Sequence, residues 1–240
     1  MVDYSKALGE AIRSFWKTRS GQLTRQKKSG TKDQGSRGAV TGGRQLNGFI
    51  NLLTKVSIRA GIPKNNIFVK GNTLPGFYRA TKDWDFIIVS DSKKLIACIE
   101  LKSQVGSFGN NFNNRTEEAL GSALDLWTAF REGGFSKQHA PWLGYLILVE
   151  KSKKSTGTVK VSEPHFKVRQ EFIKTNYLSR YEILCRKLMR ERMYNATTFI
   201  WTTKQGSNIA YGCPKDEISF NSFIDSFSSH LVSSKREFEG

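Results

Sequence analysis

Residues 84–102 read WDFIIVSDSKKLIACIELK, and the fold class can be predicted outward from their pattern. Two apolar runs rich in β-branched residues lie on either side of a polar turn at Asp91–Lys93. This pattern predicts two buried strands, over 84–90 and 94–102, joined as an antiparallel hairpin. A hairpin that turns there places Asp85 opposite Ile99 and Glu100.

Further elements are predicted on both sides of this hairpin. Strands are expected at 67–70, 142–150 and 197–203, and helices at 4–17, 45–60, 165–194 (one helix or two) and 218–231. Apolar residues at helical spacing from Ala119 to Phe130 predict another helix, and Asn114 with Glu117 has the form of its capping box. The segments 71–83 and 103–115 are expected to be loops. The chain is thus predicted to be α/β, a central mixed β-sheet flanked by helices, in a single domain over 1–240.

The net charge indicates a polyanionic partner. Thirty-eight Lys and Arg against 21 Asp and Glu give a formal charge of +17. Nucleic acid is the commonest partner of so basic a protein, and no basic amphipathic helix favours a membrane. Residues 17–44 hold eight Lys and Arg, one Asp and six Gly without apolar periodicity. We expect this segment to be a basic flexible arm or loop, either contacting phosphate or serving as a linker.

Other functional classes find little support in the sequence. The cysteines are three, scattered and without the spacing of a disulfide framework or a zinc site. The N-terminus has no apolar signal core, and no stretch is long and apolar enough for a membrane span. We therefore expect a cytoplasmic protein.

The candidate site lies at the ends of the predicted hairpin. Side chains alternate along a strand, so Glu100 and Lys102 point to the same face, and Asp85 approaches them from the neighbouring strand. Paired carboxylates are typical ligands of Mg²⁺, and the Leu101 carbonyl would add a third oxygen. Lys102 would orient the attacking water or stabilise charge on the phosphate. The same three charged positions also occur by chance in many sheets.

A resemblance makes this interpretation specific. Asp85 followed by Glu100-Leu101-Lys102 resembles the PD-(D/E)xK nuclease signature, with Trp84 where that signature has proline. The run IELKSQVGSFGNNFNNRTEEALGSALDLWTAF (99–130), flanked by LPGFYRATKDWDFIIV and PWLGYLILVE, is similar to the XhoI family of type II restriction endonucleases. The resemblance implies a restriction-endonuclease-like fold with its catalytic core at 66–150.

The resemblance also implies an activity. Members of that family make Mg²⁺-dependent double-strand cuts in DNA at the palindrome CTCGAG, leaving 5′-phosphates. It implies a homodimer, since a two-fold symmetric site is matched by a two-fold protein. It implies a bacterial or archaeal source with a cognate DNA methyltransferase for the same site.

The residues that read the bases are expected close to the predicted site. Asn and Gln pair with adenine, and Arg and Lys with guanine. The segment after Lys102 begins at the site and is rich in such side chains. The candidate DNA-binding residues are Gln104, Asn110, Asn111, Asn113, Asn114, Arg115, Arg79 and Lys82.

Three alternatives remain open from the sequence. A structure-specific or repair nuclease could share the same PD-(D/E)xK core. A non-catalytic DNA-binding protein could use the carboxylates only to pair with Lys102. An RNA-binding protein would explain the net charge alone.

Overall fold

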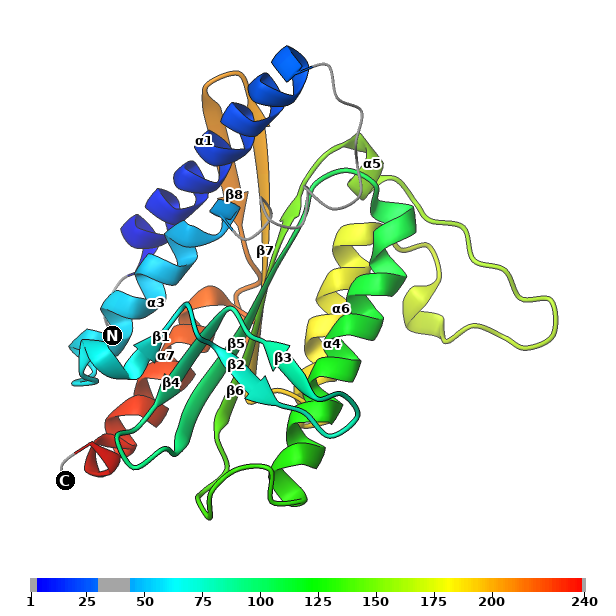
Figure 1. The fold of residues 1–240 in the computed structure, drawn as a ribbon. Helices are drawn as coiled ribbons and strands as arrows, with labels where there is room; N and C mark the ends of the chain where they lie inside the picture. Colours follow the sequence, from blue (N-terminus) through cyan, green and yellow to red (C-terminus); the bar gives the residue numbers. More distant parts are fainter. Residues whose placement is uncertain (1–3, 30–43, 239–240) are drawn as a thin grey trace.

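The structure is a computed structural model that describes residues 4–29 and 44–238. Its centre is a six-stranded mixed sheet (Figure 1). The strands β5, β6 and β7 run parallel, and the remaining pairs are antiparallel. In spatial order the strands are β1 (Ile67–Phe68), β4 (Phe86–Val89), β5 (Leu95–Gln104), β6 (Trp142–Glu150), β7 (Ala196–Gln205) and β8 (Asn208–Gly212). The predicted α/β class and mixed sheet are confirmed.

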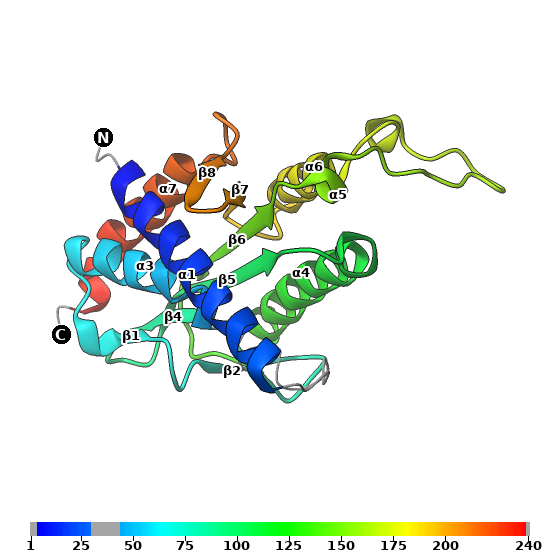
Figure 2. The ribbon, with the colours of Figure 1, turned by 90° about the horizontal axis from the view of Figure 1, so that it is seen from above.

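Helices cover both faces of this sheet (Figures 1 and 2). One face carries α1 (Ser5–Ser29), α3 (Asn47–Arg59) and α7 (Phe220–Ser233). The other carries α4 (Phe108–Arg131) and α6 (Tyr177–Arg190). The short helical segments are α5 (Lys153–Thr156) and the 3₁₀ turns Lys64–Asn66, Gln170–Phe172 and Lys235–Glu237.

The two hydrophobic cores follow from side-chain alternation along the strands. On β6, Leu143, Tyr145 and Ile147 belong to the core under α4 and α6. Leu146 and Leu148 belong to the core under α1, α3 and α7. Because both faces are covered, these strands are apolar throughout rather than alternating with polar residues. Burial on two sides fixes the register of the central strands and therefore the position of every side chain they carry.

The register of the β4–β5 hairpin agrees with the prediction. Phe86 pairs with Ile99 and Ile87 with Cys98, so the next position along places Asp85 opposite Glu100. A register shift after Ile88 lies near the turn, away from these carboxylates. Both acidic residues therefore lie at the same end of the strand pair.

The predicted loop at 103–115 is wrong. β5 continues to Gln104 and α4 begins at Phe108, so Ser107 precedes the helix and Asn114 is no cap. Asparagine and glycine are poor helix formers, but packing overrides that preference here. Phe108 stacks on Tyr177 of α6 with ring centroids 5.8 Å apart, and Phe112 lies edge-on to Tyr181 at 5.1 Å.

The first half of the predicted basic arm is also helical. α1 does not stop at residue 17 but continues to Ser29, while residues 30–43 lie outside the described part of the chain. The apolar periodicity ends at Trp16, yet the Lys, Arg and Gln that follow are good helix formers. The helix is held along β7, where Trp16 donates to Thr202 (3.0 Å) and Lys204 donates to Ser20 (2.6 Å).

Three further differences concern short elements. The predicted loop 71–83 contains a separate two-stranded sheet of β2 (Thr73–Pro75) and β3 (Thr81–Asp83). The helix expected over 165–194 is shorter, since α6 begins only at Tyr177. Strand β8 was not predicted, because its sequence NIAYG is short and half-exposed. The strands β2, β3 and β8 are short and have little apolar surface, so sequence periodicity is weak there.

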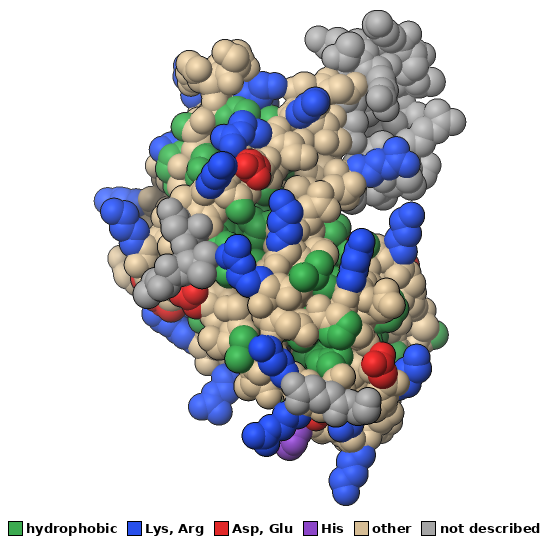
Figure 3. Space-filling model, turned by 90° about the vertical axis from the view of Figure 1, so that its left-hand side faces the viewer, with side chains coloured by type: hydrophobic (Ala, Val, Ile, Leu, Met, Phe, Trp, Pro, Cys, Tyr) green, Lys and Arg blue, Asp and Glu red, His purple; other side chains and the backbone are tan. Residues whose placement is uncertain are grey.

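The charge surplus is visible on the molecular surface. Lys and Arg side chains are spread over the face that includes α1 and α3, with few acidic side chains between them (Figure 3). Within residues 4–29 and 44–238, no helix combines the length and the apolarity needed to cross a membrane.

Candidate active site

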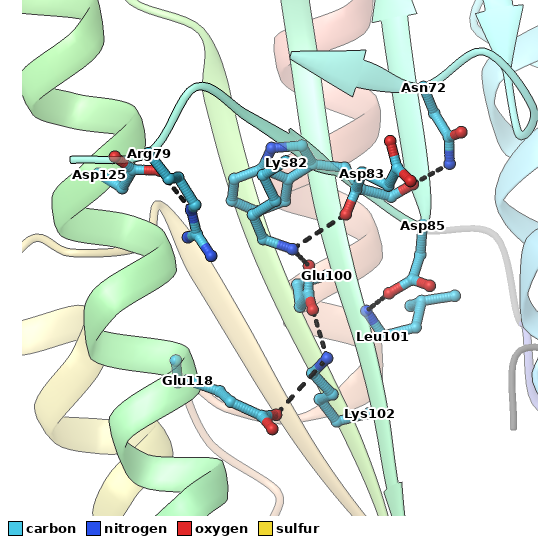
Figure 4. A network of polar contacts seen from close by, with 12 residues as sticks. Asn72, Arg79, Lys82, Asp83, Asp85, Glu100, Leu101, Lys102, Glu118 and Asp125 are labelled. Atoms are coloured by element: carbon cyan, nitrogen blue, oxygen red, sulfur yellow. Dashed lines mark hydrogen bonds and ion pairs between the residues drawn. The ribbon is translucent and has the colours of Figure 1, made fainter. Parts of the chain in front are cut away.

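Strand alternation brings the three predicted site residues to one face of the sheet. Glu100 and Lys102 share the side of β5 on which Cys98 packs toward α4, and Asp85 shares the side of Ile87. Figure 4 shows Glu100 and Lys102 in contact, with Asp85 beside Leu101 on the neighbouring segment. The predicted cluster is therefore present in the structure, and its role in catalysis remains a prediction.

Glu100 is the centre of this cluster. Its side chain is only 4% exposed, and each of its oxygens meets a lysine. Oε1 lies 2.5 Å from Lys102 Nζ, and Oε2 lies 2.8 Å from Lys82 Nζ. Burial alone would raise the pKa of Glu100, but the two lysines outweigh burial and the pKa is lowered. Glu100 is thus a buried carboxylate kept ionised by two cations.

Asp85 is in a different electrostatic position. Its Oδ2 accepts a hydrogen bond from the Leu101 backbone N–H at 2.7 Å. Burial and then repulsion from Glu100 raise the pKa of Asp85 to about 6, despite that hydrogen bond and the nearby lysines. The negative charge on Asp85 is therefore incompletely compensated by the protein.

Lys102 connects the strand to helix α4. Its Nζ lies 3.6 Å from a carboxylate oxygen of Glu118, which in turn lies 2.5 Å from Arg115. Burial lowers the pKa of Lys102, but Glu100 and the other acidic neighbours raise it by more than burial lowers it. The net effect is a raised pKa, so the ammonium stays charged. A charged lysine donates hydrogen bonds and cannot accept a proton from water.

The β2–β3 hairpin that carries Lys82 is fastened to the same helix. Asp125, on α4, accepts from the backbone N–H groups of Phe77 and Tyr78 (2.8 Å each) and from Arg79 Nε (2.7 Å). Gly76 permits this approach, since a Cβ there would lie 2.6 Å from an Asp125 oxygen. One buried carboxylate thus fixes the tip of the hairpin over the sheet.

A cavity of about 590 Å³ opens on the cluster. Its walls come from the β2–β3 hairpin, from β5 and from α4, so that it lies between the elements that carry the charged side chains. It is lined by Tyr78, Arg79, Lys82, Glu100, Lys102, Glu117, Glu118, Gly121, Ser122, Leu124 and Asp125.

The residues present fit a hard divalent cation. Asp85 and Glu100 offer carboxylate oxygens, and burial together with repulsion from Glu100 raises the pKa of Asp85, which a cation bound to both would relieve. In an extended strand the N–H and C=O of one residue point to the same side, so the Leu101 carbonyl faces Asp85 as well. Among the described residues no group of three acidic, His or Cys ligands occurs. Mg²⁺ suits such a sparse site, because it keeps several water ligands.

The predicted DNA-binding residues fall into two groups. Three of them, Asn110, Asn113 and Asn114, are exposed and lie on one face of α4 at i, i+3 and i+4. The others make internal contacts: Gln104 is buried and donates to Gly106, Asn111 donates to Ser107, Arg115 pairs with Glu118, Arg79 with Asp125, and Lys82 with Glu100.

Sequence reasoning missed the roles of Lys82, Glu118 and Asp125. Asp125 carries no signal in the sequence, because it lies on the opposite side of the predicted helix from Ala119, Ala123 and Trp127. Lys82 and Glu118 carry none either. Their proximity to Glu100 arises only from the packing of the β2–β3 hairpin and α4 on the sheet.

A mixed sheet flanked by helices, with two carboxylates and a lysine converging at one hairpin end, defines a restriction-endonuclease-like nuclease core. Residues 25–212 match the family model described as restriction endonuclease XhoI. The chain belongs to this family of type II restriction endonucleases, and it is a site-specific DNA endonuclease.

Individual relatives agree with this assignment. The type II restriction enzyme BstVI of Geobacillus stearothermophilus is 46% identical over 213 residues, covering 86% of this chain and 95% of that protein. The type II restriction enzyme XhoI of Xanthomonas vasicola is 46% identical over 193 residues, covering 79% and 77%. The type II restriction enzyme AbrI of Azospirillum brasilense is 42% identical over 170 residues, covering 70% and 76%. No solved structure matches the chain.

Proposed function

We propose that this endonuclease makes Mg²⁺-dependent double-strand cuts at a short palindromic site, CTCGAG, and leaves 5′-phosphates. The observation that carries the chemistry is the pair of carboxylates Asp85 and Glu100 beside the charged Lys102, with Glu100 and Lys102 lining an open cavity. Family membership supports the recognition sequence and disfavours the alternatives of a repair nuclease and of a non-catalytic binding protein.

In this proposal each residue has one task. Asp85, Glu100 and the Leu101 carbonyl would hold Mg²⁺, which would lower the pKa of a bound water and neutralise charge on the phosphate. Lys102 donates a hydrogen bond that orients the attacking water, because its raised pKa keeps the ammonium charged. Its contact with Glu100 places Nζ beside the ligand oxygens.

The exposed face of α4 is the proposed reading surface. Asn110, Asn113 and Asn114 lie in the first two turns of α4, which follows shortly after the end of β5. In this proposal they form a helix face rich in amide groups close to the scissile phosphate. Paired amide donors and acceptors suit the edge of adenine. Arg79 pairs with Asp125 through Nε alone and Arg115 with Glu118 through Nη1 alone, so each guanidinium keeps further N–H donors for a phosphate.

The wider context follows from the same activity. We propose that the chain acts as one nuclease domain and as a homodimer, since a palindrome presents two equivalent strands to two equivalent sites. A cognate methyltransferase would protect the same sequence in the bacterial or archaeal cytoplasm where the enzyme meets DNA.

The test compares two glutamates that line the same cavity. Wild-type protein with Mg²⁺ is expected to cut plasmid DNA into discrete bands, and EDTA should abolish them. Glu100→Gln should lose cleavage but retain DNA binding by fluorescence anisotropy, whereas Glu117→Gln, which changes an exposed glutamate, should cut normally. Run-off sequencing of the products gives the recognition sequence and the cut position. Normal cleavage by Glu100→Gln would refute the site assignment.

A further inference from the structure

The surroundings of Lys82 differ from those of an exposed lysine that is free to bind DNA. Its side chain is only 13% exposed and points inward from β3. Nζ donates to Glu100 Oε2 at 2.8 Å and to the Asp83 carbonyl at 3.0 Å, and it lies 4.4 Å from the centroid of the Trp84 ring. The ammonium is therefore fully engaged with the protein (Figure 4).

This contact balances the charge of the cluster. The ammonium groups of Lys82 and Lys102 both contact Glu100 and also act electrostatically on Asp85, so two positive charges stand against two negative ones. Arg115 already compensates Glu118. A divalent cation would thus enter a cluster with no net negative charge, and Lys82 would repel it at close range.

Lys82 also occupies an oxygen that the metal would use. Both oxygens of Glu100 have a lysine partner, and the Lys82 contact is the one made from outside the β4–β5 hairpin. β3 belongs to a two-stranded sheet separate from the central one. Lys82 can therefore leave Glu100 without any change in the central sheet.

The cavity supplies a second partner for the ammonium. Lys82 and Glu100 both line it, and in the proposed function it receives the scissile phosphate. Phosphate oxygens are strong acceptors for a lysine ammonium. When DNA enters, Nζ can exchange a carboxylate for a phosphate while remaining at the same wall, and Glu100 Oε2 becomes available.

We propose that Lys82 is a positioning residue that couples metal binding to DNA binding, by pairing with Glu100 in the free protein and with the scissile phosphate in the complex. This inference rests on the proposed metal site. It implies that the free protein binds divalent cations weakly and that DNA strengthens this binding. An enzyme built this way assembles its metal site mainly on DNA.

The test measures metal affinity rather than cleavage. Ca²⁺, which takes the same oxygen ligands, is titrated into metal-free protein by isothermal titration calorimetry. Lys82→Met should bind Ca²⁺ about tenfold more tightly than wild type, because one close positive charge is gone. Lys82→Arg keeps the charge and should stay near wild type. Lys70→Met, which removes an exposed lysine, controls for net charge and should not change the affinity.

A second titration measures the coupling itself. With a saturating duplex that contains CTCGAG, checked on a gel to be uncut, wild-type Ca²⁺ affinity should rise at least about tenfold. The same duplex should raise the affinity of Lys82→Met by a clearly smaller factor. Circular dichroism and the melting temperature establish that each variant is folded, and Lys82→Gln repeats the test with a polar side chain.

The outcomes distinguish the proposed metal site from the proposed coupling role of Lys82. If Asp85→Asn binds Ca²⁺ as tightly as wild type, with or without the duplex, the proposed metal site is wrong. If Asp85→Asn loses binding but Lys82→Met and Lys82→Gln match wild type in both titrations, the metal site stands and the coupling role of Lys82 is overturned.

Discussion

Replacing Asp125 by alanine should release the tip of the β2–β3 hairpin. The Asp125 side chain is 6% exposed and accepts from two backbone N–H groups and from Arg79. Hydrogen bonds to a charged group contribute about 1.5–3 kcal/mol each, but the partly exposed donors regain water when the carboxylate is lost. We therefore expect the hairpin to lose about 2–3 kcal/mol of stability against local opening.

Hydrogen exchange followed by mass spectrometry reports that opening directly. A loss of this size corresponds to exchange about 30- to 150-fold faster in peptides covering 73–83. The lost contacts are absent from both the open hairpin and the unfolded chain, so the free energy of global unfolding in urea should fall by up to about the same 2–3 kcal/mol. Cleavage should also decrease, since Lys82 lies on this hairpin. Glu117→Ala, an exposed change on the same helix, is the control. Wild-type exchange rates in Asp125→Ala would refute the anchoring role.

Two further predictions test contacts on either side of the sheet. Glu118→Gln removes the charge that faces Lys102 and should lower the cleavage rate severalfold with DNA affinity unchanged. Glu117→Gln, a change at an exposed neighbour, should behave as wild type. Equal cleavage rates for Glu118→Gln and wild type would contradict a positioning role for Glu118. His230 contacts the Ile96 carbonyl at 3.0 Å, and burial lowers its pKa below 6.5. The unfolded chain then takes up the proton more readily, so stability should fall as the pH drops below about 6.5. His230→Gln should show a smaller loss between pH 7.5 and 5.5 in urea unfolding, and an equal loss in both proteins would argue against this origin.

The centre of the fold was predictable because burial on two faces leaves a clear pattern. The hairpin at 84–102 has two apolar runs and one polar turn, and its register follows once the turn is located. Strand β6 is apolar from Trp142 to Val149 and was expected with the bounds that the structure shows. In both cases the free energy that decides the structure resides in the residues of the segment itself.

The periphery was less predictable because its structure depends on partners far away in the chain. The start of α4 is rich in glycine and asparagine, and it is helical because Phe108 and Phe112 pack on Tyr177 and Tyr181. The second half of α1 lacks an apolar stripe, and at its start Ser20 accepts a hydrogen bond from Lys204 of β7. The helix propensities of the residues themselves do not reflect such long-range contacts.

The same division applies to the site. Asp85, Glu100 and Lys102 could be located from spacing, since one hairpin carries all three. The second cation on Glu100 could not, because Lys82 reaches it from a separate small sheet. The DNA-binding candidates were chosen for their chemical type, and several of these side chains are occupied by internal partners that only the packing reveals.

The order of the strands has a consequence for the newly made protein. From β4 to β8 the strands lie side by side in the order in which the ribosome delivers them. The charged cluster comes from residues 82–118, yet β5 has an open edge until β6 arrives, and the core under α4 is incomplete until α6 follows. A nascent chain that has only its catalytic segment therefore lacks the support that holds that segment in place. A partly synthesised copy of this DNA-cutting enzyme should be harmless to the genome of the cell that makes it.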